Sequence, residues 1–481
     1  MSHPNILFLM GDEHPVFMNG CYGHRSAQTP TLDALSASGA TFDAAYCASP
    51  LCAPSRAALL AGRHIHTLET WDNASPFRSD WPTFAHSFRY AGYRTILCGK
   101  MHFVGPDQMH GFEERWTQDI YPADFQWTRK SREWSIYNDG QNVDRVMEAG
   151  IGWTKDMDYD EEVLFRALYG LRRISAEKPF MLCVSFTGPH YPFKAPQEYW
   201  DHYTDDDVDL PKMPADFARG DHAHVKWLRD IGGYNTLVSD DICRTARHAI
   251  LGRISMLDDY LAKILRVLRE QRLDEDTIIV YTSDHGDMMG EHGLWFKQAS
   301  YEWSSRVPLL FSGPGIPAGH RSAEPVSLLD MGSTLCGLAG IESLNPRPDG
   351  RDITDLVQRT RADGPGLAIM ENYSECLWRG IRTVRRGNCK LNITAGSEPE
   401  MYDLANDPDE WHNIAQDEAY LSTREELERL ALTDWNPDAL DEQRWQSEER
   451  RDAIMRAAHA TQSYGWQYPS PSPEHPIGVI A

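Results

Sequence analysis

Short hydrophobic runs bounded by turn residues alternate with segments of helical periodicity along most of the chain. The clearest helix is predicted from about Asp241 to Arg272, where apolar residues recur at spacings of three and four. The strand-like runs are NILFLM (5–10), RTILCGK (94–100), FMLCVSFT (180–187), TIIVYTSD (277–284) and VPLLFSGPG (307–315). This alternation predicts an α/β fold with a mostly parallel sheet and helices on both faces.

The pattern changes near residue 365. The segment GIRTVRRGNCKLNITAG (380–396) predicts two strands joined at 386–388, and the Asp-Pro pair of the following MYDLANDPDEWHNIA (401–415) predicts a turn. We therefore predict a catalytic domain over 1–365, a smaller C-terminal α+β domain on an antiparallel sheet over 366–464, and an extended, proline-containing tail over 465–481. Trp466 and Tyr468 in that tail favour a homo-oligomer, either a dimer or a tetramer.

The charge balance restricts the classes of partner. Lys and Arg number 47 and Asp and Glu number 71 in 481 residues, a net charge of -24, which disfavours nucleic acid and anionic membrane surfaces. No apolar stretch reaches the roughly 18 residues of a membrane span. The run Asn5–Met10 has no basic region before it, so we expect a buried strand there rather than a signal peptide. Scattered, odd-numbered cysteines favour the cytoplasm, with the periplasm second.

Polar residues follow several of the predicted strands, at the sheet edge where ligands of open α/β folds bind. Asp12, Asp284 and His285 are candidate ligands of one divalent cation: Ca²⁺ is favoured because carboxylates dominate, and Mn²⁺ is the alternative because of the imidazole. One such aspartate alone would more simply cap a helix. Positive charge for an anionic substrate is available on four side chains, namely Lys100, His102, His190 and Lys297.

Cys52 lies in SPLCAPSRAALLAGR (49–63), at the start of a predicted helix. Taken alone it could be a core residue, a thiolate nucleophile or a ligand of a soft metal. The segment from Cys52 through Arg56 to Arg63, however, resembles the signature of type I sulfatases of the alkaline phosphatase superfamily. In that family a maturation enzyme oxidises the cysteine to formylglycine (3-oxoalanine). The resemblance implies hydrolysis of small sulfate monoesters through a formylglycine nucleophile and a sulfo-enzyme intermediate.

The resemblance also implies roles for individual residues. Asp12, modified Cys52, Asp284 and His285 match the metal ligands of the family, and Arg56 matches the arginine that steadies the aldehyde hydrate. Lys100 and His102 match a pair beside the nucleophile and sulfate, and His190 and Lys297 match groups near the bridging oxygen. Glu13 departs from the pattern, because many sulfatases have a second aspartate ligand there.

Four strings resemble the choline sulfatase branch: SPLCAPSRAALLAG, WDNASPF, GKMHFVGPDQMHGFEERWTQDIYPADFQWT and SDHGDMMGEHGLWFK. This closer match implies that Asn73 and Trp127 line the substrate pocket, and the separate segment AIMENYSE (368–375) implies that Glu371 faces the choline cation. A quaternary ammonium gains roughly 0.5 to 2 kcal/mol from an aromatic face. Trp127 is equally well explained as a core residue.

Two other functions stay open from the sequence. The first is an aryl sulfatase, or a promiscuous phosphonate monoester or phosphodiester hydrolase of the same superfamily, because a site for a tetrahedral anion accepts several esters. The second is a non-catalytic, metal-binding homologue in which Cys52 stays a thiol.

Overall fold

The computed structural model describes residues 3–129, 141–175, 177–214, 222–374 and 376–461. The predicted tail over 465–481 lies outside the described residues, and so does the basis of the predicted homo-oligomer. None of the described helices combines the length and the apolar character needed to cross a bilayer.

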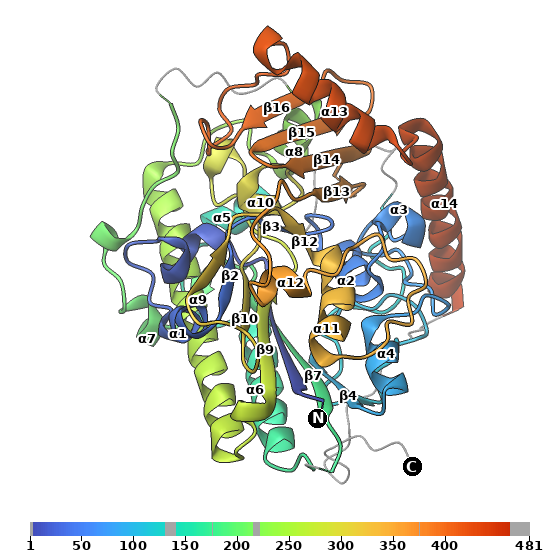
Figure 1. The fold of residues 1–481 in the computed structure, drawn as a ribbon. Coiled ribbons are helices and arrows are strands. Elements are labelled where there is room, and N and C mark those ends of the chain that lie inside the picture. Colours follow the sequence, from blue (N-terminus) through green and yellow to red (C-terminus); the bar gives the residue numbers. More distant parts are fainter. Residues whose placement is uncertain (1–2, 130–140, 176, 215–221, 375, 462–481) are drawn as a thin grey trace.

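An eight-stranded sheet forms the centre of the molecule (Figure 1), in the order β11-β2-β10-β9-β1-β7-β4-β5. Strands β9, β1, β7, β4 and β5 are mutually parallel, whereas β10 runs antiparallel to both β9 and β2. The mostly parallel sheet is thus confirmed, and the run VPLLFSGPG is the predicted strand that reverses direction. The strands are β1 (Asn5–Asp12), β2 (Ala40–Phe42), β4 (Arg94–Gly99), β5 (Glu114–Arg115), β7 (Phe180–Pro189), β9 (Thr277–Ser283), β10 (Leu309–Ser312) and β11 (His320–Ser322).

Alternate residues of β1 enter two different cores, because successive side chains of a strand point to opposite faces. Leu7 and Leu9 pack with apolar side chains of α1, α6 and α9, whereas Ile6 and Phe8 pack with those of α2, α4 and α11. Helices therefore cover both faces of the sheet (Figure 1). Their bounds are α1 (Pro30–Ser38), α2 (Cys52–Ala61), α4 (Phe84–Tyr90), α6 (Lys155–Leu171), α9 (Asp240–Glu270) and α11 (Met331–Ala339).

Helix α9 begins one residue before its predicted start and ends two residues before its predicted end.

The remaining short elements connect these layers. Two small ladders join β3 (Ala45–Tyr46) to β12 (Val326–Ser327) and β6 (Gly150–Ile151) to β8 (Lys194–Ala195). The short helices are α3 (Ile65–Leu68), α5 (Val143–Met147), α7 (Gln197–Trp200), α8 (Ala223–Gly232), α10 (Glu302–Ser305) and α12 (Thr354–Val357).

A second, antiparallel sheet follows in the order β13-β14-β15-β16. Its strands are β13 (Ala368–Asn372), β14 (Ile381–Arg386), β15 (Cys389–Thr394) and β16 (Glu400–Asp403), with α13 (Leu421–Leu432) packed on β14 and β15. The hairpin predicted at 386–388 is present, and Gly387 takes the positive φ of +54° that its turn requires.

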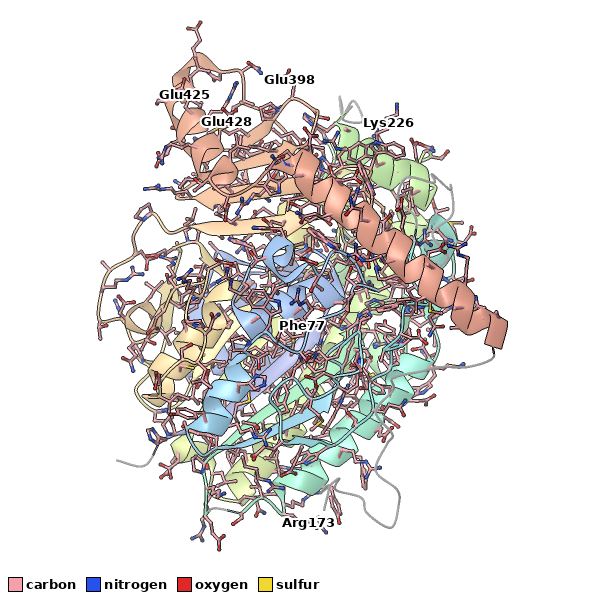
Figure 2. The ribbon with its side chains drawn as sticks, turned by 90° about the vertical axis from the view of Figure 1, so that its right-hand side faces the viewer. Phe77, Arg173, Lys226, Glu398, Glu425 and Glu428 are labelled. Atoms are coloured by element: carbon pink, nitrogen blue, oxygen red, sulfur yellow. The ribbon has the colours of Figure 1, made fainter. Side chains whose placement is uncertain are left out.

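The last described helix, α14 (Pro437–Thr461), returns along the outside of the molecule (Figure 2). Its Arg451 binds Asp72 with two hydrogen bonds of 2.7 Å, and both side chains are buried. Helix α14 is therefore fixed to the loop that also carries Asn73.

Candidate active site

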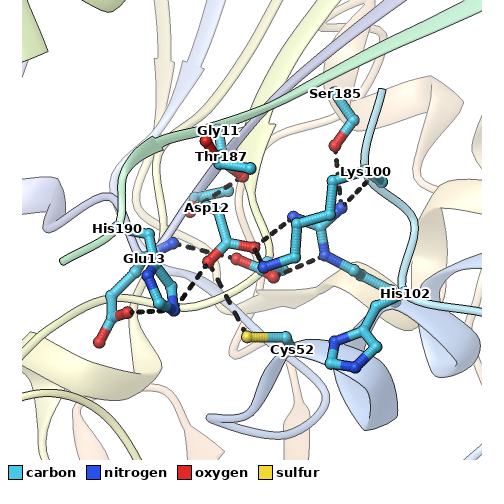
Figure 3. Close-up of polar contacts among 12 residues, drawn as sticks. Gly11, Asp12, Glu13, Cys52, Lys100, His102, Ser185, Thr187 and His190 are labelled. Carbon is cyan, nitrogen blue, oxygen red and sulfur yellow. Dashed lines mark hydrogen bonds and ion pairs between the residues drawn. The ribbon is translucent and has the colours of Figure 1, made fainter. Parts of the chain in front are cut away.

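The carboxyl ends of β1, β4, β7 and β9 meet at one sheet edge and bring the predicted polar residues together (Figure 3). Asp12 ends β1, Lys100 follows β4, His190 follows β7, and Asp284 follows β9. Helix α2 points its first residue, Cys52, at this edge. All ten residues of α2 are buried, because the helix is enclosed by the core and covered on every side.

Four side chains offer converging ligand atoms. One atom each from Asp12, Cys52, Asp284 and His285 lies within 4.8 Å of the others, and all four residues are buried. The Nδ1 of His285 lies 3.0 Å from the carbonyl of Gly286, to which it donates, so Nε2 faces the Cys52 Sγ at 3.2 Å. That backbone hydrogen bond holds the tautomer in which Nε2 keeps its lone pair. Two carboxylates and a correctly oriented imidazole fit a divalent cation.

Arg56 binds both carboxylates of this group. Its Nη2 lies 2.6 Å from Asp12 Oδ2, its Nε lies 2.7 Å from Asp284 Oδ2, and its Nη1 reaches the Ser185 hydroxyl at 2.8 Å. Burial opposes ionisation of Asp12, yet Lys100 and Arg56 keep its pKa well below the usual range. One guanidinium thus orients both aspartates. Its planar, forked N–H groups match the geometry of carboxylates. Sequence reasoning missed Ser185, since a serine inside a buried strand carries no distinguishing signal.

Lys297, His190 and Glu13 form a second group on the other side of Cys52 (Figure 3 shows Glu13 and His190). The ammonium of Lys297 donates to Glu13 Oε2 at 2.8 Å and to His190 Nε2 at 2.8 Å, and it lies 3.3 Å from Cys52 Sγ. His190 Nδ1 donates to the carbonyl of Tyr191, which leaves Nε2 as the acceptor. Glu13 therefore forms an ion pair with Lys297. The two carboxylates in the group of four converging ligand atoms are those of Asp12 and Asp284.

Lys100 and His102 lie on the side of Asp12 away from Glu13 and His190 (Figure 3). The Lys100 ammonium lies 2.5 Å from Asp12 Oδ2 and 4.2 Å from the ring centre of Tyr121. Burial, with Lys100 beside it, lowers the pKa of His102 to about 3, so its ring is neutral. The backbone amide of His102 donates to Asp119 Oδ2 at 2.8 Å. Sequence reasoning did not single out Asp119 or Tyr121, although both lie inside the long string (99–128) that resembles choline sulfatases.

Comparison with known proteins identifies the fold and the chemistry. The family model described as "Sulfatase" matches residues 4–341. The chain belongs to the sulfatase family. A second model, "N-sulphoglucosamine sulphohydrolase, C-terminal", matches residues 290–434 of this sulfatase. The protein is therefore a sulfuric ester hydrolase.

Individual relatives of this sulfatase cover nearly all of its length. It is 37% identical to the choline-sulfatase of Rhizobium meliloti over 97% of this chain and 93% of that protein. It is 28% identical to the arylsulfatase of Clostridium perfringens over 89% and 94% of the two chains. The crystal structure of the phosphonate monoester hydrolase of Agrobacterium radiobacter shares the fold, with a TM-score of 0.71 at 22% identity over 92% and 96%. The predicted alkaline phosphatase-like fold is confirmed.

Two of the residues assigned to the substrate pocket lie beside the polar cluster of this sulfatase. Asn73 Oδ1 accepts the backbone amide of Ala53 at 3.0 Å, directly after Cys52. Trp127 is 41% exposed, and its ring centre lies 5.6 Å from that of His102 and 4.9 Å from that of Tyr121. Trp127 is thus a partly exposed ring at the site rather than a core residue.

Glu371 has different neighbours. Its carboxylate is buried and binds His66 Nδ1 at 2.7 Å and Arg382 Nε at 3.4 Å. Within the described ranges, these ion pairs take up its charge, and no hydrogen bond or ion pair joins Glu371 to the Cys52 group. Burial opposes its ionisation, but the hydrogen bond from His66 and the charges of His64 and Arg382 lower its pKa to about 2.

This ion pair predicts a pH-dependent contribution to stability. Because the pKa of Glu371 is depressed in the folded state, its contribution is complete above the unfolded pKa of about 4.5 and is lost as the pH falls towards 2. We expect Glu371→Gln to lower the free energy of unfolding by about 3 kcal/mol at pH 7, the equivalent of the pKa shift. Urea unfolding at pH 7 and pH 3 tests this. A variant as stable as the parent at pH 7 would contradict it, and so would a deficit as large at pH 3 as at pH 7.

Proposed function

We propose that this sulfatase hydrolyses small sulfate monoesters, with choline-O-sulfate as its substrate, through a formylglycine at position 52. The observation that carries the proposal is the position of Cys52. It is the first residue of a buried helix, it belongs to the group of four candidate ligands, and its Sγ lies 3.3 Å from the Lys297 ammonium. An atom at this point can contact both a cation and the sulfur of a sulfate ester.

The unmodified thiol is poorly suited to attack sulfur. Burial and the neighbouring Asp12 raise the pKa of Cys52 to about 12, so it is a neutral thiol at physiological pH. The formylglycine hydrate supplies two hydroxyls on one carbon, one to attack sulfur and one to release sulfate afterwards. Because Cys52 is only 1% exposed, we infer that the maturation enzyme acts on the unfolded chain, where Pro54 and Arg56 are accessible.

Asp12, residue 52, Asp284 and His285 would hold the divalent cation. Ca²⁺ is favoured by the two carboxylates, and Mn²⁺ is the alternative because of His285. When bound, the cation lowers the pKa of a hydroxyl on residue 52 and withdraws charge from the sulfate oxygens. Arg56 holds both aspartates in fixed orientations for this task.

Three groups of the chain handle charge and protons. Lys100 neutralises the non-bridging sulfate oxygens, because its ammonium lies beside Asp12 on the nucleophile's side. Lys297 carries the proton nearest the bridging oxygen, since His190 Nε2 accepts from it and holds it in place. His102 is neutral and acts as the base when sulfate is released. The negative sulfate beside it raises its proton affinity.

The choline-sulfatase of Rhizobium meliloti and the exposed Trp127 support the choice of substrate. The rings of Trp127 and Tyr121 offer aromatic faces next to Lys100 and His102, where a trimethylammonium group could be held. Because the Glu371 carboxylate is already paired with His66 and Arg382, we assign recognition of the trimethylammonium group to the two aromatic rings. The alternative substrate class, aryl sulfates, is supported by the arylsulfatase relative.

A comparison of substrates tests the assignment. We expect kcat/KM to be highest for choline-O-sulfate when it is compared with an aryl sulfate and a phosphonate monoester. We expect Trp127→Ala to lower kcat/KM for choline-O-sulfate about 10-fold, because the lost cation–π contact is worth up to roughly 2 kcal/mol. The loss in kcat/KM should be smaller for an aryl sulfate, because its leaving group carries no positive charge.

The matched control is Trp227→Ala, at a half-buried tryptophan of α8. It should leave kcat/KM unchanged for both choline-O-sulfate and the aryl sulfate. A parent enzyme that prefers the aryl ester would reject the choline assignment. An equal effect of Trp127→Ala on both esters would show that the ring positions the sulfate rather than the cation.

A further inference from the structure

A second group of potential metal ligands lies between α8 and the second sheet. His222 is the N-cap of α8, His224 is in its first turn, and Glu400 is the first residue of β16. The Nδ1 atoms of His222 and His224 lie 3.5 Å and 3.4 Å from the same oxygen, Glu400 Oε2. In Figure 2, Lys226 of α8 and Glu398 just before β16 both lie at this end of the molecule.

The polar atoms of this group lack hydrogen bonds to one another. Both ring nitrogens of His224 and the Oε2 of Glu400 are buried without a hydrogen-bond partner among the described residues. Such orphaned atoms are rare in native proteins and require an explanation, for example a bound ion. His224 is fully buried, so solvent at its ring does not supply the missing partner.

The spacing of the three atoms fits coordination better than hydrogen bonding. Hydrogen bonds between nitrogen and oxygen are about 2.7 to 3.2 Å long. In a tetrahedral zinc site with bonds of about 2.0 to 2.1 Å, two ligand atoms are separated by about 3.3 to 3.4 Å. The 3.4 and 3.5 Å distances from Glu400 Oε2 to the two imidazoles match this separation.

The electrostatics also leave room for a cation. Tyr402 and Tyr301 donate to the other oxygen of Glu400, and among the described residues only the two histidines lie within ion-pair distance of its carboxylate. The positive end of α8 opposes a cation here, and the carboxylate of Glu400 offsets it.

We propose that His222, His224 and Glu400 bind a divalent cation of the zinc type. Two imidazoles and one carboxylate are a ligand set that zinc uses, with water in the fourth position. The side chain of His222 is 23% exposed, which gives that water and the ion access to solvent. The site shares no residue with the Asp12 group. It joins α8 to β16, so the ion stabilises the contact between the main part of the chain and the second sheet.

Metal binding by the full-length protein tests the proposal. Chelator-treated protein is loaded with Ca²⁺ to occupy the Asp12 group and then titrated with Zn²⁺, and with Co²⁺ as the spectroscopic probe. We expect about one equivalent of Co²⁺ with the absorption of a tetrahedral nitrogen and oxygen site, and an increase in Tm with Zn²⁺. His222→Ala and the conservative Glu400→Gln should each weaken Zn²⁺ binding by about 100-fold or more, because the loss of a residue that only hydrogen-bonds to a metal ligand already costs about 10- to 100-fold.

His412→Ala is the control, since this histidine side chain is 83% exposed and belongs to neither group. Its binding curve should match that of the parent. Sulfatase turnover should persist in His222→Ala, so a failure of the proposed function and a failure of this site give different results. An unchanged Zn²⁺ affinity in both His222→Ala and Glu400→Gln would overturn the proposal, and so would Co²⁺ spectra that show only octahedral coordination.

Discussion

The Cys52→Ala variant should lose sulfate ester turnover by about 10⁴-fold or more, the scale seen when an enzyme loses its nucleophile. Alanine removes the Sγ atom, which lies 3.8 Å from Asp12 Oδ1 and 3.3 Å from the Lys297 ammonium. Because the residue is small and the substitution keeps α2 intact, we expect the fold to persist. Steady-state kinetics on the parent and the variant, purified from a host with the maturation enzyme, measure this loss.

Two further variants separate the chemistry from the packing. Cys52→Ser offers one hydroxyl and no geminal partner, so we expect attack on sulfur without rapid release of sulfate. Cys336→Ala removes another buried cysteine, in α11, and should leave kcat/KM unchanged. Mass spectrometry of the peptide that contains residue 52 should show an aldehyde in the active parent. An active parent that carries a thiol there would refute the formylglycine mechanism.

The sequence predicts most of the sheet and the edge that carries the site. The strands β1, β4, β7 and β9 are apolar runs that end in polar residues, and parallel strands bring their carboxyl ends to one edge. For this reason Asp12, Lys100, His190 and Asp284 could be placed near one another without coordinates. The match to the sulfatase signature added Cys52 and Arg56.

Pairings between distant residues could not be predicted in this way. Nothing local in the sequence indicates that Glu371 binds His66, 305 positions away, or that Lys297 joins Glu13 across 284 positions. These contacts depend on how β13 and the loop after β9 dock on the first half of the chain. Helix α14 was also missed. Its polar sequence shows little amphipathic periodicity, and it is fixed by contacts with distant residues, such as that between Arg451 and Asp72.

The largest loss of stability is expected from Arg56→Met. Methionine fills a similar volume but takes the guanidinium away from both Asp12 and Asp284, which leaves Asp12 with Lys100 and Asp284 without its arginine partner. The side chains of Arg56, Asp12 and Asp284 are all fully buried. Removing one partner of a buried ion pair costs about 3 to 5 kcal/mol, and this arginine has two carboxylate partners. We therefore expect Arg56→Met to lower the free energy of unfolding by at least about 3 kcal/mol in chelator-treated protein, measured by urea unfolding.

The matched control for Arg56→Met is Arg78→Met. Arg78 pairs with Asp80 at 2.6 Å, but both side chains are more than half exposed, so the expected cost is below about 1 kcal/mol. Addition of Ca²⁺ should recover part of the stability of Arg56→Met, because a cation between Asp12 and Asp284 replaces some of the lost charge. Equal losses in the two variants would show that Arg56 contributes by packing alone. No response to Ca²⁺ would show that the two aspartates hold a cation only when the guanidinium orients them, which makes Arg56 a positioning residue for the metal.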